Sequence, residues 1–401
     1  MTSRIKYFVV SSSTLLTVFL LAGSVFGQGA SQDDTFKHIG VFSEVVGYIE
    51  KQYVEEPDMK SVTLGALDGM LEAIDPFASY LNADQYRDYQ KNKDVKRADV
   101  GLVLSKRYGM VVVVDAIPGS PAAKAGFSTG DMIESIKGVA TRDMPLAYAY
   151  MLLQGDLASD VELSVVRARH PEPQTVKLTR ANIVLPAIES KMLVSDVGYI
   201  NVNSLSTAHL KEVTDAVKQL QKNGAKKLIV DVRYCGVGTP EEGIAFANLF
   251  LKSGRITYLK GQRVAQQNFD ADPSKDITDL PLAVLTNRGT ADGAEIAAAA
   301  LMGNKRAQLI GERTYGDAAQ RKALTMEDGS AIILSVAKYY AQDGKAIQDT
   351  GVTPDKLVAE AEPAVTYDEN DQPIPDAKPQ QTQPQKLEDD PVVKKALEVL
   401  G

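Results

Sequence analysis

The chain has 401 residues with a formal net charge of −8, and its length predicts two or three domains at about 100–200 residues each. Its 44% hydrophobic and 24% charged residues exclude a wholly disordered chain, a collagen and a multi-span membrane protein. The acidic balance argues against nucleic-acid binding as its main role. A single cysteine excludes an intramolecular disulfide, and with only three histidines it argues against a zinc site. We expect neither a metal ion nor a cofactor.

Residues 1–27 have the pattern of a secretory signal. Arg4 and Lys6 precede a mostly apolar run that is shorter than the ~20 residues needed to span a bilayer. Small residues, Val25 and Gly27, stand at positions −3 and −1 of the expected cleavage site. We therefore expect export to the periplasm or cell envelope. The alternative is an uncleaved amino-terminal anchor, the only route by which membrane association is expected.

Residues 28–96 are expected to form a small helical region. Two segments carry apolar residues at a spacing of three and four, which is typical of amphipathic helices. They are Phe36, Ile39, Phe42, Val46, Ile49 and Tyr53 in the first, and Leu64, Leu67, Met70, Leu71 and Ile74 in the second. Asp75-Pro76 ends the second helix.

Residues 97–184 are expected to form a self-contained β-rich module. β-Branched and turn residues predict strands and short helices in alternation. The predicted strands are 111–114, 132–136, 161–166 and 175–178, and the predicted helices are 122–127 and 146–153.

Residues 185–357 alternate strands with helices, which predicts an α/β core with some parallel pairing. The predicted strands are 199–202, 228–232 and 282–285, and the predicted helices are 210–220, 244–251 and 294–301. Residues 358–391 are rich in proline and glutamine and predict a solvated linker. A short helix within 392–401 ends the chain.

Several motifs, in order along the chain, resemble those of the S41 serine peptidases, the carboxyl-terminal processing or tail-specific proteases. The resemblance covers nearly the whole chain after the signal and implies a ClpP/crotonase-like α/β core with an inserted PDZ domain. The matching segments are DPFASYL at 75–81, the PDZ-like GSPA at 119–122, AG at 125–126 and GDMI at 130–133, DVR at 231–233, 287–296, GERTYG at 311–316 and GVTPD at 351–355.

The chemistry positions depart from the family pattern. The resemblance implies a serine nucleophile, but Asp292 stands there, and Asp317 replaces the lysine general base. Arg321 stands where glutamine is usual, and Phe77 where histidine is usual. Two carboxylates provide neither a nucleophilic hydroxyl nor a neutral amine, which Ser/Lys chemistry requires. The sequence therefore predicts a non-catalytic member, a pseudoprotease.

The oxyanion region is also altered. The family's N-N-P-G-G, whose backbone N–H groups stabilise the tetrahedral intermediate, corresponds here to residues 234–238. The equivalents of the oxyanion region are Val237, Gly238 and Gly293. A valine resists the positive φ that glycine adopts, so the aim of these N–H groups is expected to differ.

The aspartates also have structural interpretations. Asp292 and Glu295 have the spacing of a capping box at a helix start. If the family fold holds, Arg321 lies between Asp292 and Asp317, keeps both ionised and makes the cluster inert. The alternative is a carboxyl dyad that shares one proton, as in aspartic proteases.

Three further chemistries have less support. A divalent cation on the two aspartates would lack further obvious ligands. Thr290 as a nucleophile has no base placed for it. Cys235 as a nucleophile has no histidine near it in the sequence and fits a buried core position.

The PDZ-like module keeps a recognisable binding motif. Gly101, Leu102 and Val103 resemble the loop whose backbone N–H groups receive a peptide carboxylate, and the peptide would add there as a strand. Tyr148 and Leu152 lie on one face of the predicted helix and would line the groove. The alternatives are that Tyr148 only packs and that the module is a structural spacer.

The sequence thus predicts an exported homologue that binds peptide or protein carboxyl termini, or pairs with an active relative, without cleaving. Two alternatives stay open: an endopeptidase with unorthodox residues, and a structural component of the envelope.

Overall fold

The computed structural model describes residues 29–93, 95, 97–107, 109–142, 144–167, 170–194, 196–360 and 386–401. The predicted signal sequence and most of the predicted linker lie outside them. The chain divides into two compact units, one up to Ala66 and one from Leu67 to Gly401. Helix α2 (Gly29–Gln52) and the first part of α3 (Met59–Glu72) belong to the first unit. All other elements belong to the second.

The PDZ-like module is an antiparallel sheet in the order β2-β3-β4-β6-β7, with β5 beside β4. Its β-branched run, Val111–Val114, is buried, as expected for a core strand. Each strand and helix predicted for 97–184 overlaps an element of this module. The elements are β2 (Leu102–Arg107), β3 (Met110–Ala116), α5 (Pro121–Lys124), β4 (Met132–Ile136), β5 (Val139–Ala140), α6 (Leu146–Leu153), β6 (Asp160–Arg167) and β7 (His170–Thr179).

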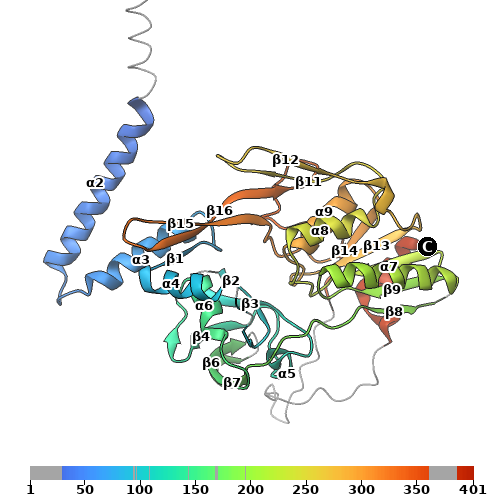
Figure 1. The fold of residues 1–401 in the computed structure, drawn as a ribbon, viewed down its shortest axis with the longest axis horizontal. Coiled ribbons are helices and arrows are strands. Elements are labelled where there is room, and N and C mark those ends of the chain that lie inside the picture. The colour runs from blue at the N-terminus through green and yellow to red at the C-terminus, as the bar shows by residue number, and fades with distance from the viewer. Residues whose placement is uncertain are drawn as a thin grey trace, which may run out of the picture. The chain divides into compact units, whose positions relative to one another are not determined.

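The second sheet has the order β17-β14-β13-β10-β9-β8 and is parallel except at β8. Helices α7, α8 and α9 cover one face, as Figure 1 shows. The elements are β8 (Glu189–Met192), β9 (Val197–Asn201), α7 (Thr207–Lys222), β10 (Lys227–Asp231), α8 (Pro240–Asn248), β13 (Leu282–Thr286), α9 (Gly293–Gly303), β14 (Ala307–Gly311), β17 (Lys356–Leu357) and α10 (Pro391–Leu400).

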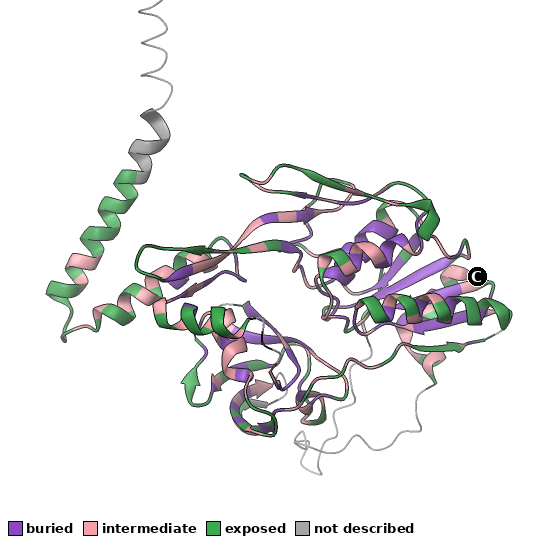
Figure 2. Ribbon diagram, viewed as in Figure 1, coloured by how far each residue is buried: buried purple, intermediate pink, exposed green. Residues whose placement is uncertain are grey.

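Alternate residues of these parallel strands face opposite sides, and both sides are buried (Figure 2). Val230 faces the cluster formed with α7, α8 and α9, whereas Ile229 faces α10. Helices α8 and α9 touch through glycines, since a Cβ on Gly243 would overlap the Gly293 carbonyl. This contact fixes the point at which α9 begins. It therefore also fixes the position of Asp292, the residue before the helix.

A third, antiparallel sheet has the order β1-β16-β11-β12, with β15 on β16. Here the sequence prediction was incomplete, because the 28–96 region contains a strand, β1, as well as helices. Its Ser79 pairs with Ile333, and Leu81 is fully buried there. The remaining elements are β1 (Ser79–Leu81), α4 (Ala83–Asn92), β11 (Arg255–Lys260), β12 (Gln267–Asp270), β15 (Ala319–Thr325), β16 (Ala331–Tyr340), and the 3-10 turns Pro273–Lys275 and Leu387–Asp389.

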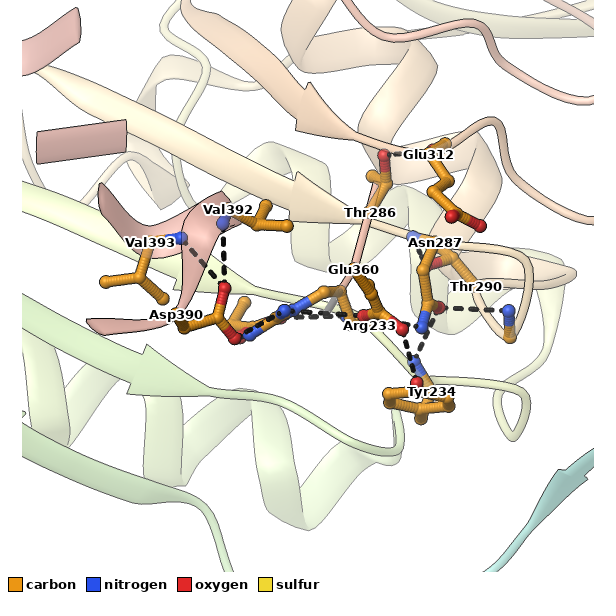
Figure 3. Close-up of polar contacts among 12 residues, drawn as sticks. Arg233, Tyr234, Thr286, Asn287, Thr290, Glu312, Glu360, Asp390, Val392 and Val393 are labelled. Carbon is orange, nitrogen blue, oxygen red and sulfur yellow. Dashed lines mark hydrogen bonds and ion pairs between the residues drawn. The ribbon is translucent and has the colours of Figure 1, made fainter. Parts of the chain in front are cut away.

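The described ends of the predicted linker are anchored, which corrects the expectation of a wholly solvated segment. Arg233 binds the carboxylates of Asp231 at 2.7 Å, Asp390 at 2.9 Å and Glu360 at 3.3 Å (Figure 3). Asp390 also accepts the Val392 N–H at 2.8 Å and so caps α10. A buried arginine needs such partners, and residues on both sides of 361–385 supply them.

Candidate active site and PDZ face

Asp292, which the motifs predict at the family's nucleophile position, immediately precedes α9 with φ 49° and ψ −118°. Such a positive φ is uncommon for a residue other than glycine and costs about 1–3 kcal/mol. The neighbouring backbone holds it: the Ala291 N–H donates to Cys235 O at 3.1 Å, and the Gly293 N–H to Gly238 O at 3.3 Å. The loop therefore holds Asp292 in a strained backbone geometry.

Glu295 ties the start of α9 to the segment that carries Asp317. It is fully buried and accepts the N–H groups of Gly316 and Asp317, each at 2.7 Å, and the Thr314 hydroxyl. It also accepts the Asp292 N–H at 3.2 Å, which is one half of the predicted capping box, while the Glu295 N–H donates to the Asp292 backbone carbonyl at 3.0 Å. Burial raises the pKa of Glu295 to about 8, against the lowering effect of these hydrogen bonds.

Arg321 forms an ion pair with Asp317 and stacks on Phe77. Its guanidinium carbon lies 4.5 Å from the centre of the Phe77 ring. The four residues interpreted from the sequence as departures from the family pattern, Phe77, Asp292, Asp317 and Arg321, thus lie around one site. Arg321 contacts both Phe77 and Asp317, and Asp292 interacts with Asp317 and Arg321 electrostatically.

The predicted Asp–Arg–Asp cluster is corrected in the pairing of Arg321. Arg321 pairs with Asp317 and makes no ion pair with Asp292 in the described structure, because its guanidinium lies over Phe77. Burial raises the pKa of both aspartates, and Asp317 raises that of Asp292 further. Arg321 lowers the pKa of each aspartate but does not outweigh burial, and whether it keeps both carboxylates ionised stays a prediction.

The two alternative nucleophiles are held in structural roles. The Thr290 hydroxyl donates to Val232 O at 2.8 Å and accepts the Asn287 N–H at 3.1 Å. Cys235 is fully buried, and burial raises the pKa of its thiol strongly. Neither group is available to attack a substrate.

The oxyanion region differs from the expectation in detail. Val237 avoids a positive φ, and Tyr234 adopts one, at 55°. The Leu205 N–H donates to Val237 O at 2.7 Å, and the Gly293 N–H is already bonded to Gly238 O. One of the predicted oxyanion donors, Gly293, is therefore engaged within the protein.

The PDZ module lies directly against this loop. A Cβ added to Gly236 would lie 3.1 Å from Asp115 Cβ and 3.5 Å from Val103 Cγ1. Asp115 is buried, its Oδ2 has no hydrogen-bond partner, and burial raises its pKa to about 7. The contact between β3 and the oxyanion loop thus contains a carboxyl group that is costly to ionise.

Replacing Asp115 by asparagine is expected to stabilise the protein at pH 8 by about 2–4 kcal/mol and to flatten its pH dependence. The folded pKa, about 7, lies above the ordinary 3.8, so the folded state binds this proton more tightly. The contribution of Asp115 to the free energy of unfolding is fully present below pH ~4 and is lost as the pH rises through 7. Urea unfolding at pH 5 and pH 8 measures this. A destabilised Asp115→Asn protein at pH 8, with exposed Asp215→Asn unchanged as control, would contradict it.

Among the predicted peptide-binding residues, Gly101 has φ 81°, and a Cβ there would overlap Ser120. Leu102 is buried and Val103 half-buried on β2. Tyr148 and Leu152 are half-buried against the module's core, and Tyr148 also packs against the cluster of Leu81 and Tyr86. Packing accounts for both side chains, and their contact with a peptide stays a prediction.

Sequence analysis missed Tyr150 and Asp99, which hydrogen-bond to the β2 edge and its loop. The helix LAYAYMLL is apolar on every side, so its pattern does not distinguish Tyr150 from Tyr148. Only the tertiary contact with Leu104 identifies it.

Comparison with known proteins agrees with this architecture. The model of peptidase family S41 matches residues 196–358, and that of the PDZ domain matches 112–167. The carboxy-terminal processing protease CtpA of Bacillus subtilis is 31% identical over 349 residues, covering 86% of this chain and 74% of the relative. The chain belongs to peptidase family S41.

Two further similarities place this S41 member among the carboxyl-terminal processing proteases. The carboxyl-terminal-processing protease of Synechocystis is 32% identical over 84% of this chain and 79% of its own length. The solved photosystem II D1 C-terminal processing protease superposes with a TM-score of 0.65 at 27% identity, covering 79% of this chain and 86% of that one. The S41 core and PDZ domain inferred from the motifs are confirmed.

The described residues contain neither a group of three or more potential metal ligands nor a helix long and apolar enough to cross a membrane.

Proposed function

We propose that this S41-family protein is an exported pseudoprotease that binds the carboxyl termini of peptides or unfolded proteins through its PDZ domain without cleaving them. The observation that carries the proposal is that Asp317, Arg321 and the neighbouring Asp292 stand where the motifs predict the family's catalytic residues, with Arg321 held by Asp317 and Phe77. Export is supported by the signal-like first 27 residues.

Hydrolysis lacks its reacting groups here. A carboxylate that attacks an amide carbonyl forms an anhydride, which is less stable than the acyl ester of a serine enzyme. Asp317 is engaged with Arg321 and cannot serve as a neutral amine base. The Gly293 N–H, bonded to Gly238 O, is also withdrawn from an oxyanion. In serine proteases that use a catalytic triad, loss of triad members lowers the catalytic rate by a factor of about 10⁴–10⁶.

For the PDZ domain, by contrast, the proposal is supported by the loop that precedes β2. Gly101 keeps a positive φ that positions the amides of this loop at the start of β2. An extended peptide could pair with β2 and present its terminal carboxylate to those amides. The match of residues 112–167 to the PDZ domain supports peptide carboxyl termini as the class of ligand.

Fluorescence anisotropy with a labelled ten-residue peptide ending in apolar residues tests the proposal. The peptide with a free carboxylate is expected to bind at least about tenfold more tightly than its amidated form, since charge-assisted hydrogen bonds are lost in the amide. Gly101→Ala is expected to abolish this preference. Gly138→Ala is a matched control, because Gly138 has a similar φ of 75° but faces open space. Equal affinities for acid and amide would overturn the proposal.

A further inference from the structure

The β2 edge that would receive a peptide already carries a hydrogen-bonding partner from within the PDZ domain. The Tyr150 hydroxyl, from α6, accepts the Leu104 N–H at 2.7 Å and donates to the Leu104 carbonyl at 3.2 Å. A residue of an adjacent antiparallel strand makes this same pair of bonds to its partner. Burial raises the pKa of Tyr150 strongly, so the hydroxyl stays protonated and able to donate.

The loop that precedes β2 carries a carboxylate of its own. Asp99 Oδ1 accepts the Val100 N–H at 2.6 Å and the Gly101 N–H at 2.9 Å. The Asp99 backbone is held by two hydrogen bonds with Ala181, at 3.0 and 2.9 Å. Two amides beside the predicted carboxylate position are therefore occupied by a fixed internal carboxylate.

We infer that Tyr150 and Asp99 close the peptide site by imitating the two parts of its ligand, a backbone and a terminal carboxylate. This inference rests on the proposed function and specifies its ligand. Only an extended chain that ends in a free carboxylate replaces all four hydrogen bonds. An internal segment would restore the two at Leu104 and leave the loop amides to Asp99.

The structure provides room for the displaced side chain. A cavity of about 290 Å³ lies beside α6 and is lined by Tyr150, Met151, Phe77 and Arg321, among others. A rotation of the Tyr150 ring into this cavity frees Leu104 without moving α6. A peptide must therefore displace the hydrogen bonds of Tyr150 and Asp99 before it binds, and chains that interact weakly do not displace them.

Tyr150→Phe tests the inference because it removes the hydroxyl and keeps the ring. Without peptide, the Leu104 amide is expected to exchange its hydrogen about tenfold faster, since it loses its partner. The carboxylate peptide is expected to bind about tenfold more tightly, because it no longer competes with the hydroxyl. Asp99→Ala is expected to tighten binding of the acid peptide severalfold and to leave the amidated peptide unchanged.

The control is Tyr86→Phe, which removes the hydroxyl of another buried tyrosine, bonded to Thr325 outside the PDZ domain, and is expected to change neither readout. Unchanged exchange at Leu104 in Tyr150→Phe would overturn the inference. So would faster exchange with unchanged peptide affinity. Faster exchange of the Leu104 amide in Tyr150→Phe, with no peptide binding by the wild type or any variant, would support the internal contact and overturn the proposed function.

Discussion

Replacing Glu295 by alanine is expected to lower the free energy of unfolding by about 3–5 kcal/mol, as expected when a buried polar network loses its central partner. The carboxylate accepts four hydrogen bonds, from the Thr314 hydroxyl and from the N–H groups of Asp292, Gly316 and Asp317. Alanine leaves these donors without an acceptor at a fully buried site. Equilibrium unfolding in urea measures the loss.

Glu242 provides a matched control for this prediction. It has the same capping-box role at α8, where it accepts the Thr239 N–H at 2.9 Å, but solvent reaches that site. Glu242→Ala is expected to cost no more than about 1 kcal/mol. Equal losses for the two variants would show that Glu295 acts only as a helix cap and does not join α9 to the 314–317 segment.

Restoring the family's side chains with Asp292→Ser, Asp317→Lys and Arg321→Gln together is expected to raise peptide hydrolysis at least about 100-fold above the wild-type background. The backbone at position 292 keeps its strained conformation, and Glu295 holds residue 317 close to it through backbone N–H groups. The serine hydroxyl and lysine amine would therefore meet. Mass spectrometry of an unfolded substrate with an apolar carboxyl terminus detects the products.

The control for this variant carries Asp292→Ala with the same changes at 317 and 321, and is expected to stay inactive. A folded triple variant without any gain would assign the loss of activity to the oxyanion loop. There the Gly293 N–H is bonded to Gly238 O, and restored side chains would not release it.

Local patterns predicted the elements of the two larger modules well, because their strands are buried and their helices are either amphipathic, as α7 is, or apolar throughout, as α6 is. They missed the third sheet. Its β15 is largely polar, and its β16 carries an apolar run without a clear period. Strand β1 has only three residues and is stabilised by pairing with β16, which lies far away in the sequence. No local signal reports such long-range pairing.

At the candidate site, motif order located Asp292, Asp317 and Arg321, but side-chain directions could not be obtained from it. The stacking of Arg321 on Phe77 depends on β1 lying near β15, and this placement is tertiary. For the same reason the hydrogen bonds between Tyr150 and Leu104 were invisible in the sequence. The residue types at the site were predictable, and their pairings were not.

The most direct test of the central claim is incubation of the purified wild-type protein with an unfolded substrate that has an apolar carboxyl terminus, followed by mass spectrometry at several pH values from 4 to 8. Several pH values are used because burial raises the pKa of Asp292 and Asp317, and that of Glu295 to about 8. We predict an intact substrate at every pH. Cleavage that disappears in Asp292→Asn would contradict the claim and show that the carboxyl groups themselves are catalytic.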